Sequence, residues 1–246
     1  MKTRAIIIFF IAAFLVPEIA AREPQGNLPT VDQILEKYVK AVGGREAITK
    51  LSTRVVKARQ EITTMGLEAD VEGYQKAPNK LLVVVTIPGH GTSSEGYDGT
   101  TGWSHDPMTG LRRKGGAELA RMKREYDLYK DINLKQHYPK MVVNGRAEVA
   151  GRQAYEVEAT PAEGAANKMY FDAETGLLIR QDGVLETPEV RLPVEYYFED
   201  YREVDGVKIP FTTRLVNSSF TTVIKLKEVK HNVPVDDAKF QVPSSK

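Results

Sequence analysis

The stretch GYDGTTGWSHDP, Gly96–Pro107, contains the only tryptophan of the chain and decides between a ligand-cradling loop and a pair of strands. A loop that cradles phosphate leads into a helix N-terminus and usually carries a lysine or arginine, but here Trp103-Ser-His-Asp-Pro follows instead. The Asp98 carboxylate would also repel a phosphate. Asp98-Gly99 is typical of a hairpin turn, with Tyr97 ending one strand and Trp103 entering the next. The stretch therefore predicts two antiparallel strands, with Trp103 pointing to one face of a sheet.

Strand-like segments and turns alternate on both sides of this hairpin. Lys80–Pro88 is apolar on both alternating faces, which predicts a central strand covered on both sides. Met65-Gly66, Asp172–Gly176 and Asp205-Gly206 are typical of turns between successive antiparallel strands. In total we expect about ten to twelve strands. This number predicts a mainly β (α+β) protein, built either as a sandwich or as a strongly curved sheet that closes on itself.

Two segments have helical rather than strand periodicity. In Asn27–Gly44 apolar residues recur every three or four positions, Thr30 and Gln33 form a capping-box pattern, and a glycine pair ends the helix. A short helical piece is expected at Glu46–Leu51. The second amphipathic helix is expected over Gly116–Met141, and its polar face mixes both signs of charge, unlike a membrane-surface helix. We expect these helices to cover the open face of the sheet. The apolar side chains on one face of the second helix are Leu119, Met122, Tyr126 and Tyr129.

The first 21 residues are typical of an export signal. Lys2 and Arg4 precede the apolar run Ala5–Val16, and small residues suited to cleavage follow at Ile19–Ala21. The run has 12 residues, whereas a bilayer-spanning helix needs about 20. We therefore expect cleavage after residue 21, no stable membrane span afterwards, and a soluble periplasmic or secreted protein over residues 22–246.

Charge and cysteine content narrow the function classes. Without the signal, 32 basic and 32 acidic residues remain, so no overall field attracts nucleic acid or an anionic membrane surface. The chain has no cysteine, so an exported protein of this sequence depends on core burial for its stability. About 225 residues suit a single domain with one core.

No constellation for covalent chemistry is visible in the sequence. The four histidines are far apart in spacing, and no serine lies in a nucleophile elbow. The carboxylates of Glu199 and Asp200 are adjacent on a predicted strand and so point to opposite faces. We predict no catalytic residue, no metal site, no cofactor and no enzymatic activity. The histidines are His90, His105, His137 and His231.

Three segments, in this order and spacing, resemble the LolA/LolB-like lipoprotein carriers of bacterial envelopes. They are Lys76–Asn79, Asp98–Pro107 with its tryptophan, and Asp237–Phe240, and the resemblance extends from about Val31 to Val242. It implies one LolA-like lipid-binding domain over residues 22–246. It also implies a half-open antiparallel β-barrel whose apolar interior, under a lid of helices, receives the acyl chains of a lipid or lipoprotein.

On this resemblance we expect the large apolar side chains near the helices to line the cavity. The chain departs from the pattern at Ala77, where carriers have an arginine that helps to latch the lid. It is thus either a divergent carrier of another lipid or an envelope sensor or protein-interaction domain, with a protein partner and a filled interior. The expected lining residues are Trp103, Tyr97, Leu119, Met122, Tyr126, Tyr129, Phe171, Tyr196 and Phe198.

Overall fold

The computed structural model describes residues 28–186 and 191–243, so the expected signal sequence, residues 1–21, lies outside the described residues. Within these ranges the chain forms one antiparallel sheet of thirteen strands that does not close into a barrel. The strands of the first half are β1 Thr53–Ile62, β2 Leu67–Lys76, β3 Lys80–Ile87, β4 Gly91–Tyr97, β5 Gly102–Asp106 and β6 Gly110–Arg113. Those of the second half are β7 Lys140–Val149, β8 Arg152–Thr160, β9 Asn167–Asp172, β10 Leu178–Glu186, β11 Arg191–Val204, β12 Val207–Val216 and β13 Thr221–His231.

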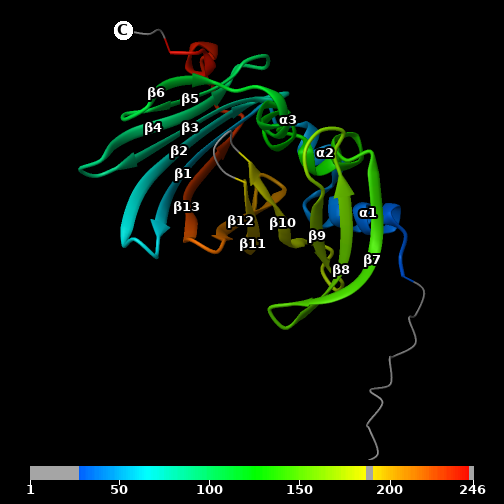
Figure 1. Ribbon diagram of the computed structural model, residues 1–246. Helices are drawn as coiled ribbons and strands as arrows, with labels where there is room; N and C mark the ends of the chain where they lie inside the picture. The colour runs from blue at the N-terminus through cyan, green and yellow to red at the C-terminus, as the bar shows by residue number, and fades with distance from the viewer. Residues whose placement is uncertain (1–27, 187–190, 244–246) are drawn as a thin grey trace, which may run out of the picture.

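The sheet consists of two meanders joined in the middle by the first and last strands. Its order is β6-β5-β4-β3-β2-β1-β13-β12-β11-β10-β9-β8-β7. β1 pairs with β13 along its length, from Arg54 opposite His231 to Ile62 opposite Thr222. Figure 1 shows the sheet bending strongly, so that the β1–β6 and β7–β9 regions form two arms around the helices. The predicted mainly β class and curved antiparallel sheet are confirmed.

The helices follow the capping chemistry of the sequence. α1 (Val31–Ala41) begins with a complete capping box, in which Thr30 and Gln33 satisfy one another's backbone N–H groups. α2 (Gly44–Thr49) follows after Gly43, whose positive φ of 117° suits glycine. Gly43 also lies too close to the Gly206 carbonyl oxygen for any Cβ to fit. Both expected helices are therefore present. α1 is shorter than the expected Asn27–Gly44, whose first residue lies outside the described ones, and α2 begins and ends two residues before the expected Glu46–Leu51.

The expected single helix over 116–141 is wrong in its extent. α3 (Gly116–Glu125) stops early, and a 3-10 turn, η1 (Lys130–Ile132), and the short α4 (Leu134–His137) follow. Asp127 causes the break, because its carboxylate accepts hydrogen bonds from Tyr129 N, Asn133 Nδ2 and His137 Nε2, each at 2.8 Å. Strand β7 then starts at Lys140, inside the expected helix. This strand brings the total to thirteen.

The main core lies between the second meander and the helices. Tyr38 of α1 packs edge-on against Phe171 of β9, with ring centroids 5.3 Å apart. The same cluster contains α2 and the α4 region on one side and the inner faces of β8–β12 on the other. Burial of this apolar surface holds α1 and α2 on the sheet. Its most deeply buried members include Val42, Ile48, Leu51, Val157, Met169 and Val207.

Candidate functional site

A cavity of about 470 Å³ lies on the inner side of the sheet, beneath α3. Its walls combine an apolar surface from the central strands with charged side chains, most of which come from the α3–α4 region. The apolar wall residues include Val56, Met169, Val184, Val194, Ile209 and Leu226. This size falls in the range of small-ligand sites, about 300–1,000 Å³.

α3 forms one wall of the cavity and is fixed to the sheet by a buried ionic cluster. Glu118 accepts two hydrogen bonds from the Arg112 guanidinium, both at 2.8 Å, and pairs with Lys114 Nζ at 3.0 Å. Lys114 also pairs with Glu95 of β4, whose carboxylate accepts a hydrogen bond from the Tyr126 hydroxyl. The Lys114 and Glu118 side chains are only 4% and 8% exposed. We call these five residues the α3 latch.

The cationic groups of the latch lower the pKa of the Glu118 carboxyl group. Hydrogen bonds from Arg112, followed by those from Lys114, lower the pKa of Glu118 from 4.5 to about 2 against the opposing effect of burial. Glu118 therefore stays charged at any physiological pH. Where the family resemblance places a latching arginine, Ala77 packs against the main core instead. The nearby Pro78 carbonyl accepts a hydrogen bond from Leu128 N at 2.9 Å, which fixes the chain just after α3.

Two sets of polar contacts lie along the side of the cavity near β1 and β13. The Tyr38 hydroxyl donates to Asp131 Oδ1 at 2.7 Å. Arg54 lines the cavity and its Nε donates to His231 Nε2 at 3.0 Å, so the proton of His231 is on Nδ1, which lies 3.1 Å from Asp205. Burial, together with the nearby Arg54 charge, lowers the pKa of His231, so its imidazole is neutral at pH 7.

Two of the nine residues expected to line the cavity do so, Tyr196 and Phe198 of β11. The other seven lie elsewhere among the described residues. Met122 and Leu119 of α3 face the sheet at Gly102, and the Tyr129 hydroxyl donates to the Leu51 carbonyl. Phe171 belongs to the main core, the Tyr97 hydroxyl donates to the Gly99 carbonyl, and Tyr126 belongs to the latch. A ligand-binding role for these nine residues stays a prediction.

Trp103 lies on the face of the sheet opposite α3. Its cross-strand partner is Gly96, where any Cβ would collide with the indole at 2.3 Å. The neighbouring Gly102 leaves room on the other face for α3. The indole Nε1 donates to the Phe240 carbonyl at 3.1 Å, and the Phe240 ring is fully buried in the same cluster. The glycines of the opening stretch therefore allow close packing on both faces.

The C-terminal turn η2 (Asp237–Phe240) holds this outer cluster in place. Asp237 pairs with Lys76 at 3.0 Å and with Lys80 at 3.1 Å, and Figure 1 shows η2 lying outside the β3–β6 arm. The three segments that carry the family resemblance thus meet in space, away from the cavity. Their contacts stabilise the fold and do not form part of the cavity wall.

The charged residues of the cavity wall were missed in the sequence. α3 directs Ala117, Arg121, Arg124 and Glu125 toward the cavity, at the i, i+4, i+7, i+8 spacing of one helical face. The helix periodicity contains this pattern, but it predicts that the apolar face, and not the charged one, points toward the cavity. That apolar face packs on β5 instead.

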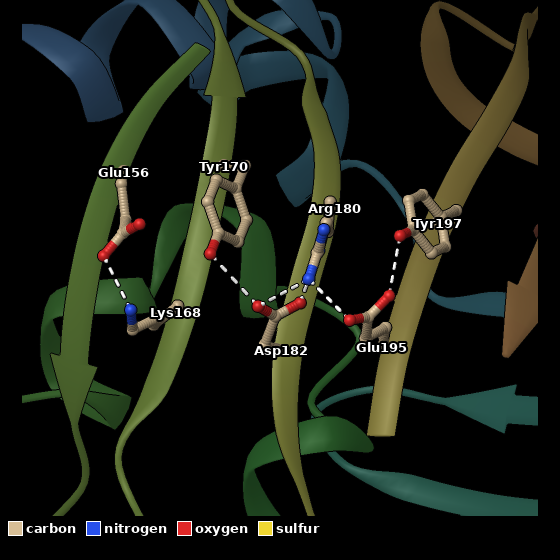
Figure 2. A network of polar contacts seen from close by, with 7 residues as sticks. All are labelled: Glu156, Lys168, Tyr170, Arg180, Asp182, Glu195 and Tyr197. Atoms are coloured by element: carbon tan, nitrogen blue, oxygen red, sulfur yellow. Dashed lines mark hydrogen bonds and ion pairs between the residues drawn. The ribbon is translucent and has the colours of Figure 1, made fainter. Parts of the chain in front are cut away.

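A second polar cluster covers the outer face of the second meander. Figure 2 shows Arg180 of β10 between Tyr170 of β9 and Tyr197 of β11, its direct cross-strand neighbours. The guanidinium lies 5.1 Å and 5.3 Å from the two ring centroids and bonds to Asp182 and Glu195. The charged and aromatic groups of this cluster are paired with one another, so we interpret the cluster as an element that stabilises the sheet.

Two further observations concern metal binding and membrane crossing. No group of three or more His, Cys, Asp or Glu side chains in residues 28–186 and 191–243 is arranged to hold a metal ion. Over the same described ranges, none of the helices is long and apolar enough to cross a membrane.

Comparison with solved structures identifies the fold. A DUF1329 family protein from Desulfovibrio piger superposes with a TM-score of 0.60 at 16% identity, covering 86% of this chain and 97% of its own. A LolA superfamily protein from Nitrosomonas europaea gives 0.58 at 14% identity, covering 87% and 98%. A putative outer membrane lipoprotein-sorting protein domain from Vibrio parahaemolyticus gives 0.55 at 10% identity, covering 84% and 97%.

The fold is therefore that of the LolA-like proteins, as the sequence resemblance predicts. Sequence comparison adds nothing to this: a scan against protein-family models finds no match, and a search of curated proteins finds none either.

Proposed function

We propose that this chain is an exported binding protein or carrier that holds a lipid acyl chain, without covalent chemistry, in the cavity beneath α3. The observation that carries the proposal is the cavity itself, whose apolar wall is formed by the central strands of the sheet. The LolA-like fold supports it, since two of the similar structures are described as a LolA superfamily protein and a lipoprotein-sorting domain.

The cavity size favours a single chain. A methylene takes roughly the room of a water molecule, about 30 Å³, so a cavity of about 470 Å³ holds about 15 such groups. Removing that chain from water contributes about 0.8 kcal/mol per methylene before the cost of ordering it. One acyl chain therefore fits in this space. The same open space favours a ligand-binding protein over the alternative, a sensor or protein-interaction domain whose interior is filled by its own side chains.

Displacement of a fluorescent fatty acid tests the proposal, together with native mass spectrometry of protein purified from cell envelopes. Val56→Phe places a ring in the cavity and should weaken fatty-acid binding at least tenfold. Val142→Phe makes the same change at a position that is 45% exposed and should leave binding unchanged. The absence of both co-purified lipid and fatty-acid binding would refute the proposal. A stable protein partner recovered without any lipid binding would support the sensor alternative.

A further inference from the structure

The face that α3 presents to the cavity is cationic, which an acyl chain alone does not require. Arg121 and Arg124 line the cavity one turn apart. The helix buries Met122 and Glu118 on its other side, against the sheet and within the latch. α3 is therefore fixed in the rotation that directs both guanidinium groups inward.

Both guanidinium groups have hydrogen-bonding capacity left over. The Nε atoms of Arg121 and Arg124 are buried and have no hydrogen-bond partner among the described residues. Arg124 is positioned by a bond of 3.0 Å from Nη1 to the Glu163 carbonyl and by the Tyr138 ring, 5.8 Å from its guanidinium carbon. Buried donors without acceptors are uncommon in native proteins and call for an explanation.

The residues that line the cavity carry more positive than negative charge. Four cationic side chains line it, against two carboxylates. Of the two, Asp131 accepts the Tyr38 hydroxyl and Glu125 lies 3.6 Å from Lys130 Nζ. No carboxylate among the described residues forms an ion pair with Arg121 or Arg124. The four cationic residues are Arg54, Arg121, Arg124 and Lys130; Lys208 is exposed, on the other face of β12 from the buried Val207 and Ile209.

We propose that the cavity binds an amphiphile with one acyl chain and an anionic head group, and that Arg121 and Arg124 hold the head. The proposal rests on the lipid-binding function proposed above and specifies its ligand class. A guanidinium fits a carboxylate or a phosphate with two parallel hydrogen bonds. The chain lies against the apolar wall at Met169, Val194 and Ile209.

Ligands that share one chain and differ only in the head group test this directly. Palmitate, palmitoyl lysophosphatidic acid and monopalmitoylglycerol compete for the intact protein against a neutral apolar fluorescent probe, in 150 mM salt. At least one anionic ligand should bind tenfold or more tightly than the neutral monoglyceride. Preference for palmitate would indicate a carboxylate head, and preference for the lysophosphatidic acid a phosphate.

The double variant Arg121→Gln with Arg124→Gln should reduce this preference to about twofold or less while the neutral probe still binds. Arg121→Lys with Arg124→Lys keeps the charge and should retain part of the preference. The matched control, Arg113→Gln with Lys123→Gln, removes two exposed charges and should retain all of it.

The outcomes separate the two proposals. If the probe and all three ligands bind with equal affinity, the head-group site is refuted and the lipid-binding function stands. If an anionic preference persists in the glutamine double variant, the assignment to α3 is refuted. If neither the probe nor any lipid binds the folded wild-type protein, both proposals fall.

Discussion

Replacing Glu118 with glutamine should destabilise the protein at neutral pH, and the effect should fade in acid. The side chain keeps its size but loses the charge that pairs with Arg112 and Lys114. Its pKa of about 2, against an ordinary 4.5, corresponds to about 3 kcal/mol at about 1.4 kcal/mol per unit. Solvent near the half-exposed Arg112 screens part of this, so we expect a loss of about 2 kcal/mol.

The sign of the pH dependence follows from the lowered pKa. The stability that Glu118 contributes is fully present above pH 4.5 and is lost as the pH falls toward 2. Urea unfolding of both proteins at pH 7, 5 and 3 measures it, and the difference in unfolding free energy should shrink steadily below pH 4.5.

Glu46→Gln provides the matched control, because the Glu46 carboxylate pairs with Lys50 on an exposed helix surface. It should leave stability unchanged at every pH. A Glu118→Gln deficit below about 0.5 kcal/mol at pH 7, or one equally large at pH 3, would show that the latch does not hold α3 in this way.

Two further substitutions separate the outer face from the cavity. Phe240→Ala removes a fully buried ring and should cost about 3 kcal/mol of unfolding free energy, shift Trp103 emission to the red, and leave fatty-acid binding to the residual folded protein intact. Unchanged emission would contradict the packing of η2 on Trp103. Arg180→Gln breaks the outer-face cluster and should cost about 1 kcal/mol, measured by urea unfolding, with lipid affinity unchanged. A large loss of lipid affinity would instead link this cluster to the cavity.

The location of Trp103 also decides how lipid binding can be measured. The indole lies in the outer cluster, on the opposite face of the sheet from α3. Its fluorescence should therefore respond little to a ligand in the cavity, so an extrinsic probe is needed.

The sequence predicted those features that depend on near neighbours. The capping box at Thr30 and the turns at Asp98-Gly99 and Asp205-Gly206 are written in a few adjacent residues, and all are present. The break after α3 was missed because Asp127 ends the helix with partners six and ten residues further on, Asn133 and His137. Local periodicity contains no sign of those contacts.

The cavity wall could not be predicted for a related reason. Alternation along a strand says that Gly102 and Trp103 point to opposite faces, but not which face the cavity occupies. Here both faces of β5 are covered, one by α3 and the other by η2, so burial gives no answer either. The inward direction of Arg121 follows only once the apolar face of α3 is seen packing on the sheet.

The pairing of β1 with β13 sets an order of events during biogenesis. During synthesis from the N-terminus, the β1–β6 meander is complete long before β13 has been made. β1 therefore lacks its partner strand until late, because Arg54 pairs with His231, near the end of the chain. Until then the inner edge of β1 is an unpaired strand edge, open to pairing with other chains. The long separation also predicts slow closure of the sheet. The seam between the two meanders is thus the point at which a partly synthesised chain is most exposed to misassembly.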